Sequence, residues 1–151
     1  DVQILHATGE LYYEKYKAQL APEAQAAENI KVVPYLHEMP LALSVADLAI
    51  ARSGAIGLAE LLVKGIPAIL IPYPYATANH QEFNARAIAK AGAAEVILDK
   101  ELTGMLLREK VEQLLTKPDT LAAMHTAAQK LSRPEAAKEI AQSALSLVKT
   151  K

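Results

Sequence analysis

The residues best suited to chemistry lie in the stretch Arg52-Ser53-Gly54-Ala55-Ile56-Gly57. A small turn at Gly54 follows an apolar run and leads into an amphipathic segment. The first backbone N–H groups of that helix would point out of its N-terminus, where they and the helix dipole attract a phosphate or diphosphate. The same residues also suit a capped turn without a ligand, with Ser53 as the cap. In isolation the turn without a ligand is the commoner case.

A single carboxylate, Glu60, follows this turn and falls in the second turn of the expected helix. A carboxylate beside a phosphate site is repulsive, so its presence there would need a reason, such as accepting hydrogen bonds from two ribose hydroxyls. The alternative is a Glu on a solvated helix surface, which is where most Glu residues lie.

A second polar group lies in the segment 79–85. His80, Gln81 and Asn84 are rich in donors and acceptors, and His80 and Asn84 stand four residues apart, on one face of a helix. This set suits hydrogen bonds to the hydroxyls of a sugar. An N-capping Asn79 followed by an ordinary polar surface explains the segment equally well.

An aromatic residue marks a third segment, Pro34 to Met39. Tyr35 can stack on a flat base, and the backbone of Leu36 can read the edge of a pyrimidine. Without further evidence, a core Tyr at the end of a strand is the favoured interpretation.

Short aliphatic runs alternate with longer amphipathic stretches and would position these residues. The expected strands are 2–7, 29–36, 48–52, 67–74 and 93–98. The expected helices are 10–20, 40–46, 55–65 and 80–92, followed by a helical region over 103–149 with breaks at Pro118 and Pro134. Apolar strands that alternate with helices predict an α/β fold with a parallel sheet covered on both faces. Ligands bind such sheets at the carboxyl ends of the strands, which is where the three polar segments fall.

Composition excludes several classes of function. The chain has no Cys, and its four His residues have no metal-ligand spacing, so no metal site or cofactor is expected. The net charge of −1 argues against a nucleic-acid partner. No apolar run reaches the roughly 18 residues that a membrane-spanning helix needs. A core strand beginning at the first residue hints at a chain cut from a longer one.

Taken together, these loops resemble the C-terminal, donor-binding domain of the MurG family, the UDP-N-acetylglucosamine (UDP-GlcNAc) transferases of peptidoglycan synthesis. The matching segments, in order, are RSGA, AEL, PAILIPYP, NHQ and GAA. The resemblance covers essentially the whole chain and is most specific over 51–94. It implies the C-terminal half of a GT-B fold, Rossmann-like with helices on both faces of the sheet and C-terminal helices after it. It also implies an inverting, metal-independent GlcNAc transferase that converts lipid I to lipid II.

The resemblance also implies roles for individual residues. Glu60 would hold the ribose hydroxyls, and Tyr35 and Leu36 would sandwich and read the uracil, with Met39 nearby. His80 and Gln81 would bind the GlcNAc hydroxyls, with Asn84 in support. The diphosphate would face the turn and its flanking Arg, a set made up of Arg52, Ser53, Gly54, Ala55, Ile56 and Gly57. Because the family often has Thr where this chain has Gly57, a side-chain contact to phosphate would be lost here.

By the same resemblance, residues 1–151 form one UDP-GlcNAc-binding domain that lacks its first strand and the N-terminal, acceptor-binding domain. Lipid I would bind through that domain, and no catalytic residue is expected in this chain. The full-length enzyme would be cytoplasmic, at the inner face of the plasma membrane. An exposed sheet edge would favour self-association. Two alternatives stay open: the donor-binding subunit of a two-chain GlcNAc transferase, and a nucleotide-sugar-binding module without turnover.

Overall fold

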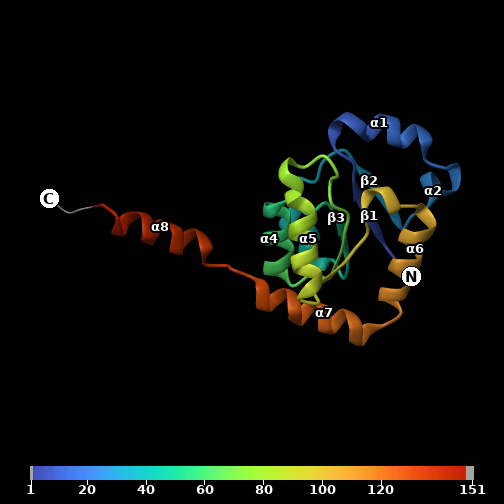
Figure 1. Cartoon of the computed structure of the whole chain (residues 1–151). Helices are drawn as coiled ribbons and strands as arrows, with labels where there is room; N and C mark the ends of the chain where they lie inside the picture. Colours follow the sequence, from blue (N-terminus) through green and yellow to red (C-terminus); the bar gives the residue numbers. More distant parts are fainter. Residues whose placement is uncertain (1, 149–151) are drawn as a thin grey trace. The chain divides into compact units, whose positions relative to one another are not determined.

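The computed structural model describes residues 2–148 and divides the chain into two compact units, 1–42 and 43–151. The path of the chain through both is drawn in Figure 1.

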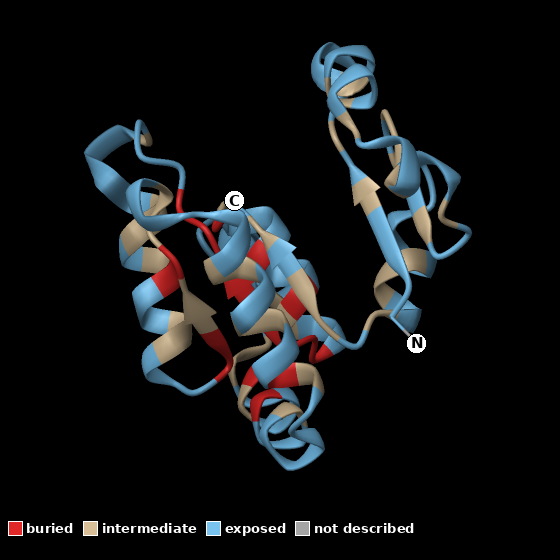
Figure 2. Ribbon diagram, turned by 90° about the vertical axis from the view of Figure 1, so that its right-hand side faces the viewer, coloured by how far each residue is buried: buried red, intermediate tan, exposed pale blue. Residues whose placement is uncertain are grey.

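The first unit contains a small parallel sheet. Its elements are β1 (Ile4–Ala7), α1 (Glu10–Gln19), α2 (Pro22–Ala26) and β2 (Ile30–Val33), and α3 (Met39–Val45) begins in it. Ile4 of β1 lies opposite Ile30 of β2. Pro34 has no N–H to donate, which is consistent with β2 ending one residue earlier. None of residues 2–42 is buried, which distinguishes this unit from the second in Figure 2.

The second unit is built on a three-stranded parallel sheet in the order β3-β4-β5. Its strands and the helices between them are β3 (Ala49–Ala51), α4 (Ala55–Lys64), β4 (Ala68–Leu70), η1 (Thr77–Asn79), α5 (His80–Lys90) and β5 (Ala94–Val96). The helices that follow are η2 (Asp99–Glu101), α6 (Gly104–Leu115), α7 (Pro118–Leu131) and α8 (Ala136–Ser146).

The hydrophobic core lies on both faces of the central strand, β4. Ala68 and Leu70 pack with Leu58 of α4 and Ala85 of α5 on one face. Ile69 points to the other face, where Leu114 of α6 and Met124 of α7 cover it. This alternation is the two-residue period of a strand. The sheet is therefore sandwiched between α4 and α5 on one side and α6 and α7 on the other.

The predicted α/β fold, with a parallel sheet between two layers of helices, is confirmed. Three expectations of detail were wrong. The strands form two parallel sheets rather than one. Not all strands are covered on both faces, since Ile4 and Leu5 of β1 are each 46% exposed. The strand expected over 67–74 is only Ala68–Leu70, because Pro72 and Pro74 cannot donate to a ladder. The short helices α2, η1 and η2 were not expected.

Candidate functional site

The carboxyl edge of the β3-β4-β5 sheet is organised around Ser53, which is fully buried. Its hydroxyl donates to the backbone oxygen of Gln81 at 2.8 Å, and its own carbonyl accepts from Asn84 Nδ2 at 3.2 Å. The option that Ser53 caps α4 is therefore wrong, because its hydroxyl is directed toward α5. These bonds tie the loop after β3 to the first turns of α5.

Gln81 connects two strand-end loops through one side-chain atom. Its Oε1 accepts from the backbone N–H of Ser53 at 3.2 Å and from that of Tyr73 at 3.0 Å. Both partners are donors, so the amide oxygen must face them and the amide NH₂ must face the other way. The NH₂ makes no hydrogen bond within residues 2–148. Gln81 thus presents a donor at the sheet edge.

The N-terminus of α4 presents backbone donors at the same edge. Gly54 is the N-cap, in an extended conformation, and no side chain caps the helix. The N–H groups of Ala55, Ile56 and Gly57 precede the first intrahelical bond, which runs from Leu58 N to Gly54 O. A Cβ added at Gly54 or Gly57 would meet nothing within 4 Å. The turn is therefore open, and its charge is the positive end of the dipole of α4.

Glu60 lies in the second turn of α4 and is exposed. Its carboxylate forms no ion pair or hydrogen bond within the part of the chain that the structure describes. Its carboxylate is therefore available to an external donor.

The chain enters α5 through two left-handed residues, Ala78 (φ 50°) and Asn79 (φ 54°). Asn79 Nδ2 donates to Glu82 Oε2 at 2.8 Å, and the Arg86 side chain also donates to Glu82. These hydrogen bonds, from Asn79 first and then from Arg86, lower the pKa of Glu82 below its usual value. They hold the first turn of α5, where His80 and Gln81 lie.

His80 is exposed at this turn. Its Nδ1 lies 2.8 Å from the carbonyl oxygen of Thr77. Because a carbonyl only accepts, Nδ1 carries the hydrogen and Nε2 of the neutral ring is an acceptor. The side chain of His80 therefore presents an acceptor, and that of the next residue, Gln81, presents a donor.

Arg52 lies at the junction of three strands. Its Nη1 is 2.5 Å from Asp99 Oδ1, 3.1 Å from Pro72 O and 3.2 Å from Ile71 O. Asp99 belongs to η2, which follows β5, and the two carbonyls follow β4. Asp99 was not among the predicted site residues, and no local pattern in the sequence marks it.

Tyr35, Leu36 and Met39 belong to the first unit. Tyr35 is 58% exposed and packs edge to face against His37, with ring centroids 5.0 Å apart. Leu36 is half-buried, and Met39, the first residue of α3, is 37% exposed. A core Tyr at the strand end, the alternative interpretation, does not fit this exposure.

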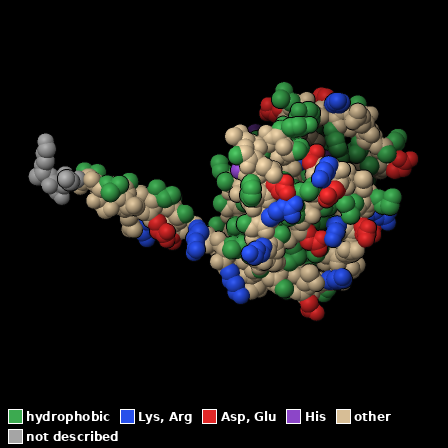
Figure 3. All heavy atoms as spheres, in the orientation of Figure 1, with side chains coloured by type: hydrophobic (Ala, Val, Ile, Leu, Met, Phe, Trp, Pro, Cys, Tyr) green, Lys and Arg blue, Asp and Glu red, His purple; other side chains and the backbone are tan. Residues whose placement is uncertain are grey.

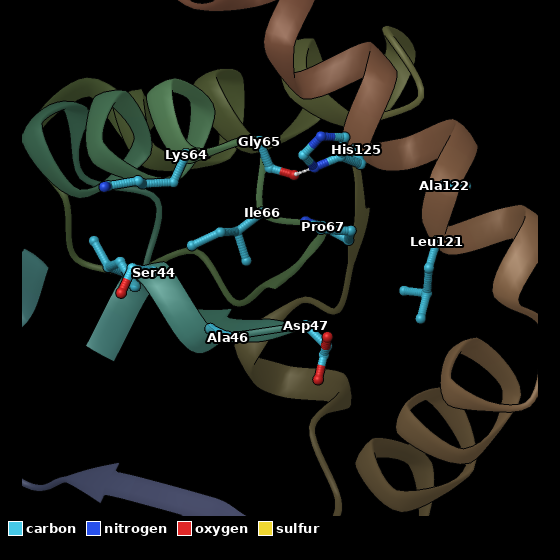
Figure 4. Close-up of a pocket in the computed structure, with 11 residues that line it drawn as sticks. Ser44, Ala46, Asp47, Lys64, Gly65, Ile66, Pro67, Leu121, Ala122 and His125 are labelled. Carbon is cyan, nitrogen blue, oxygen red and sulfur yellow. Dashed lines mark hydrogen bonds between the residues drawn. The ribbon is translucent and has the colours of Figure 1, made fainter. Parts of the chain in front are cut away.

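A cavity of about 430 Å³ lies elsewhere on the second unit, at the amino ends of its strands (Figure 4). Asp47 precedes β3 and Pro67 precedes β4, and His125 of α7 closes one side with its Nδ1 at 2.6 Å from Gly65 O. None of the predicted site residues lines it.

Charged side chains and potential metal ligands do not gather at one place in the described residues (Figure 3). In Figure 3, acidic and basic side chains are interspersed over the visible face. Within residues 2–148 no three His, Asp or Glu residues are grouped as a metal site would need. In the same range no helix has both the length and the apolar character to cross a bilayer.

The parallel sheet with helices on both faces has the Rossmann-like α/β architecture, in which ligands bind at the carboxyl edge of the strands. The model of the glycosyltransferase family 28 C-terminal domain matches residues 1–140, and the chain belongs to this family.

Known relatives place the chain near one branch of that family. It is 47% identical over 142 residues to the UDP-N-acetylglucosamine–N-acetylmuramyl-(pentapeptide) pyrophosphoryl-undecaprenol N-acetylglucosamine transferase of Desulforamulus reducens, and 45% identical to that of Moorella thermoacetica. These alignments cover 92% and 99% of this chain but only 38% and 41% of the relatives. The chain thus spans about two fifths of the length of the curated relatives it matches.

Solved structures agree with this placement. The crystal structure of Acinetobacter baumannii MurG superposes with a TM-score of 0.82 at 28% identity, over 96% of this chain and 41% of that one. The glycosyltransferase VinC, solved with dTDP, shares the fold alone, with a TM-score of 0.66 at 17% identity. The resemblance to the MurG family seen in the sequence is confirmed.

Proposed function

We propose that this chain is the UDP-GlcNAc-binding part of an inverting, metal-independent GlcNAc transferase that converts lipid I to lipid II. The observation that carries the proposal is the bridge made by Gln81. This bridge joins the loops after β3 and β4 and leaves an amide donor beside the uncapped N-terminus of α4. Membership of family 28 and the activity for which the relatives are named support it.

In this proposal the donor's diphosphate lies against the N-terminus of α4. The N–H groups of Ala55, Ile56 and Gly57 bind its oxygens, and Arg52 flanks the turn. Ser53 contributes by positioning this loop, because its hydroxyl is already bonded to Gln81.

The remaining groups bind the two ends of the donor. Glu60 accepts from the ribose hydroxyls, and Tyr35 and Leu36 contact the uracil with Met39 nearby. Gln81 donates to a GlcNAc hydroxyl, while His80 accepts from one. Asn84 supports the site from behind, since its amide is bonded to Ser53 O.

The proposed chemistry is one displacement. A hydroxyl oxygen of lipid I attacks the anomeric carbon from the side opposite to UDP, which inverts that centre. A new glycosidic C–O bond forms, the bond to the UDP oxygen breaks, and the electron pair leaves with UDP. The donors at α4 stabilise the charge that develops on the diphosphate, a role that a metal ion plays in other transferases. The base that takes the hydroxyl proton is not among the residues assigned here.

Titration calorimetry with UDP-GlcNAc tests donor binding. Glu60→Gln removes the carboxylate, and Glu139→Gln, an exposed residue in the first turn of α8, makes the same charge change as a control. We expect Glu60→Gln to weaken binding roughly tenfold or more, since hydrogen bonds to charged groups contribute about 1.5–3 kcal/mol. Glu139→Gln should bind as the wild type does. Equal affinities for all three proteins would remove the ribose role, and no binding by the wild type would refute the proposed function.

Three further measurements separate the finer parts of the proposal. Excess EDTA should leave UDP-GlcNAc affinity unchanged if no metal bridges the diphosphate. Transfer to a lipid I acceptor by this chain alone would exclude a module without turnover. A partner chain that co-purifies in a fixed ratio and is needed for transfer would favour the two-chain enzyme.

A further inference from the structure

We propose that Asp99 is a positioning residue for the diphosphate, acting through Arg52. This inference rests on the proposed function and adds a residue to its site. The geometry comes from η2, the short helix after β5, whose first residue reaches across the sheet edge to the loop after β3.

A single nitrogen of Arg52 bears all the observed hydrogen bonds. Its Nη1 is shared among Asp99 Oδ1 and the carbonyl oxygens of Ile71 and Pro72. One guanidinium nitrogen therefore ties together the ends of β3, β4 and β5. An Arg side chain has five N–H donors in a fixed planar fork, so the two on Nη1 are engaged and those on Nε and Nη2 are not. Within residues 2–148 neither Nε nor Nη2 makes a hydrogen bond.

The free edge of this fork is what an anion needs. The Arg52 side chain is 49% exposed, and its guanidinium lies 5.8 Å from the centre of the Tyr73 ring, within the range of a cation–π contact. Asp99 on one edge and Tyr73 on one face restrict the rotation of the guanidinium. Parallel N–H groups held in this way bind phosphate oxygens in pairs, as a flexible ammonium cannot.

The ion pair contributes little to folding by itself. Both side chains are partly exposed, 49% for Arg52 and 36% for Asp99, and pairs of this kind are weak and screened by salt. Loss of Asp99 should therefore leave the melting temperature nearly unchanged. Its effect should appear in the affinity for a ligand that carries phosphate.

Charge and positioning predict opposite signs for this effect. If Asp99 acted only as a charge, its removal would make the edge more positive and would strengthen the binding of an anion. If Asp99 positions Arg52, its removal releases the guanidinium and weakens binding. The sign of the change on Asp99→Ala is therefore diagnostic.

The test uses the full chain with UDP and with uridine, which lacks phosphate. We expect Asp99→Ala to weaken UDP binding roughly three- to tenfold, in the lower part of the range of coupling between groups in contact, and to leave uridine binding and the melting temperature unchanged. Asp99→Asn keeps an oxygen acceptor, so its affinity for UDP should lie between those of the wild type and Asp99→Ala. Asp119→Asn, an exposed Asp in α7, changes charge equally and should have no effect.

Arg52→Lys completes the experiment. It should weaken UDP binding, and Asp99→Ala should have no further effect in that background. If Asp99→Ala binds UDP as tightly as the wild type or more tightly, the positioning role of Asp99 is overturned and the proposed function is not. Equal losses for UDP and uridine would reveal a general disturbance and overturn it too. A wild type that binds neither ligand would overturn the proposed function, and this inference with it.

Discussion

Ser53 and Gln81 are joined by two hydrogen bonds, both of which Ser53 donates. The N–H of Ser53 donates to Gln81 Oε1 at 3.2 Å, and the Ser53 hydroxyl donates to the Gln81 carbonyl at 2.8 Å. The loop after β3 and the first turn of α5 therefore move together. Since the loop also forms the N-terminus of α4, this pair sets the distance between the backbone donors of α4 and the side chains of α5.

Substitution of Gln81 should separate its acceptor role from its donor role. Gln81→Glu keeps an oxygen for the N–H groups of Ser53 and Tyr73, so its unfolding free energy should stay near that of the wild type. It replaces the free NH₂ with an acceptor and a charge, so UDP-GlcNAc affinity should fall at least tenfold. Gln81→Ala leaves two N–H groups without their partner and should cost about 1–3 kcal/mol of stability. Urea unfolding and calorimetry measure both quantities. Equal stability of the Ala and Glu variants would contradict the bridging role.

Gly57 should accept a larger side chain and gain a phosphate contact from it. A Cβ there meets nothing within 4 Å, and the residue lies in the first turn of α4. Gly57→Thr adds a hydroxyl beside the proposed diphosphate and should raise UDP affinity severalfold. Gly57→Val has nearly the same shape and no hydroxyl, so it is the matched control and should not raise it. The same affinity in both variants would place the phosphate away from this residue.

The residues of the site could be predicted from the sequence better than their contacts. The Gly-containing turn before α4 and the polar start of α5 follow from local patterns. The direction of the Ser53 hydroxyl does not. Whether it caps its own helix or reaches a residue 28 positions later depends on how α4 and α5 pack on β4, where Leu58 and Ala85 share one core cluster.

The contact of Asp99 with Arg52 could not be predicted from local sequence patterns either. It lies 47 positions from Arg52, and the two meet because β3 and β5 flank β4 in the sheet. Strand patterns predict that loops share an edge, but not the order of the strands. Strand lengths were also overestimated, because a hydrophobic run such as 67–74 continues as loop after the strand ends at Leu70, buried at Ile71 and Pro72 and exposed at Tyr73 and Pro74.

Gly65 should tolerate no side chain, for two separable reasons. Its φ is 70°, and an added Cβ would lie 2.6 Å from His125 Cε1. Gly65→Ala should therefore destabilise the fold by roughly 1–3 kcal/mol from backbone strain alone, with the clash in addition. In a His125→Ala background the clash with the imidazole is absent and the added Cβ keeps only the 3.0 Å contact with Gln129 Cγ, so the cost of Gly65→Ala should fall toward the strain alone. Thermal unfolding of the four proteins measures this coupling. Strict additivity would show that His125 does not restrict this position.

Glu82 should make the stability of the start of α5 depend on pH in the acid range. Hydrogen bonds from Asn79 and Arg86 lower the pKa of Glu82 in the folded protein. The folded state therefore binds fewer protons than the unfolded state near the usual Glu pKa of about 4.3. The stabilisation is fully present above that pH and is lost as the pH falls through the lower, folded pKa.

The test is the unfolding free energy measured by urea titration between pH 3 and 7. In Glu82→Gln the titrating group is gone, so its stability should fall less steeply below about pH 4.5 than that of the wild type. Glu139→Gln, on α8, removes a carboxylate with no hydrogen bond of this kind in the described residues, and should keep the wild-type slope. Identical slopes for Glu82→Gln and the wild type would show that the contacts of Glu82 with Asn79 and Arg86 do not persist in solution. The left-handed turn before His80 would then be held by the backbone bonds of η1 and α5 and by the bond between His80 Nδ1 and Thr77 O.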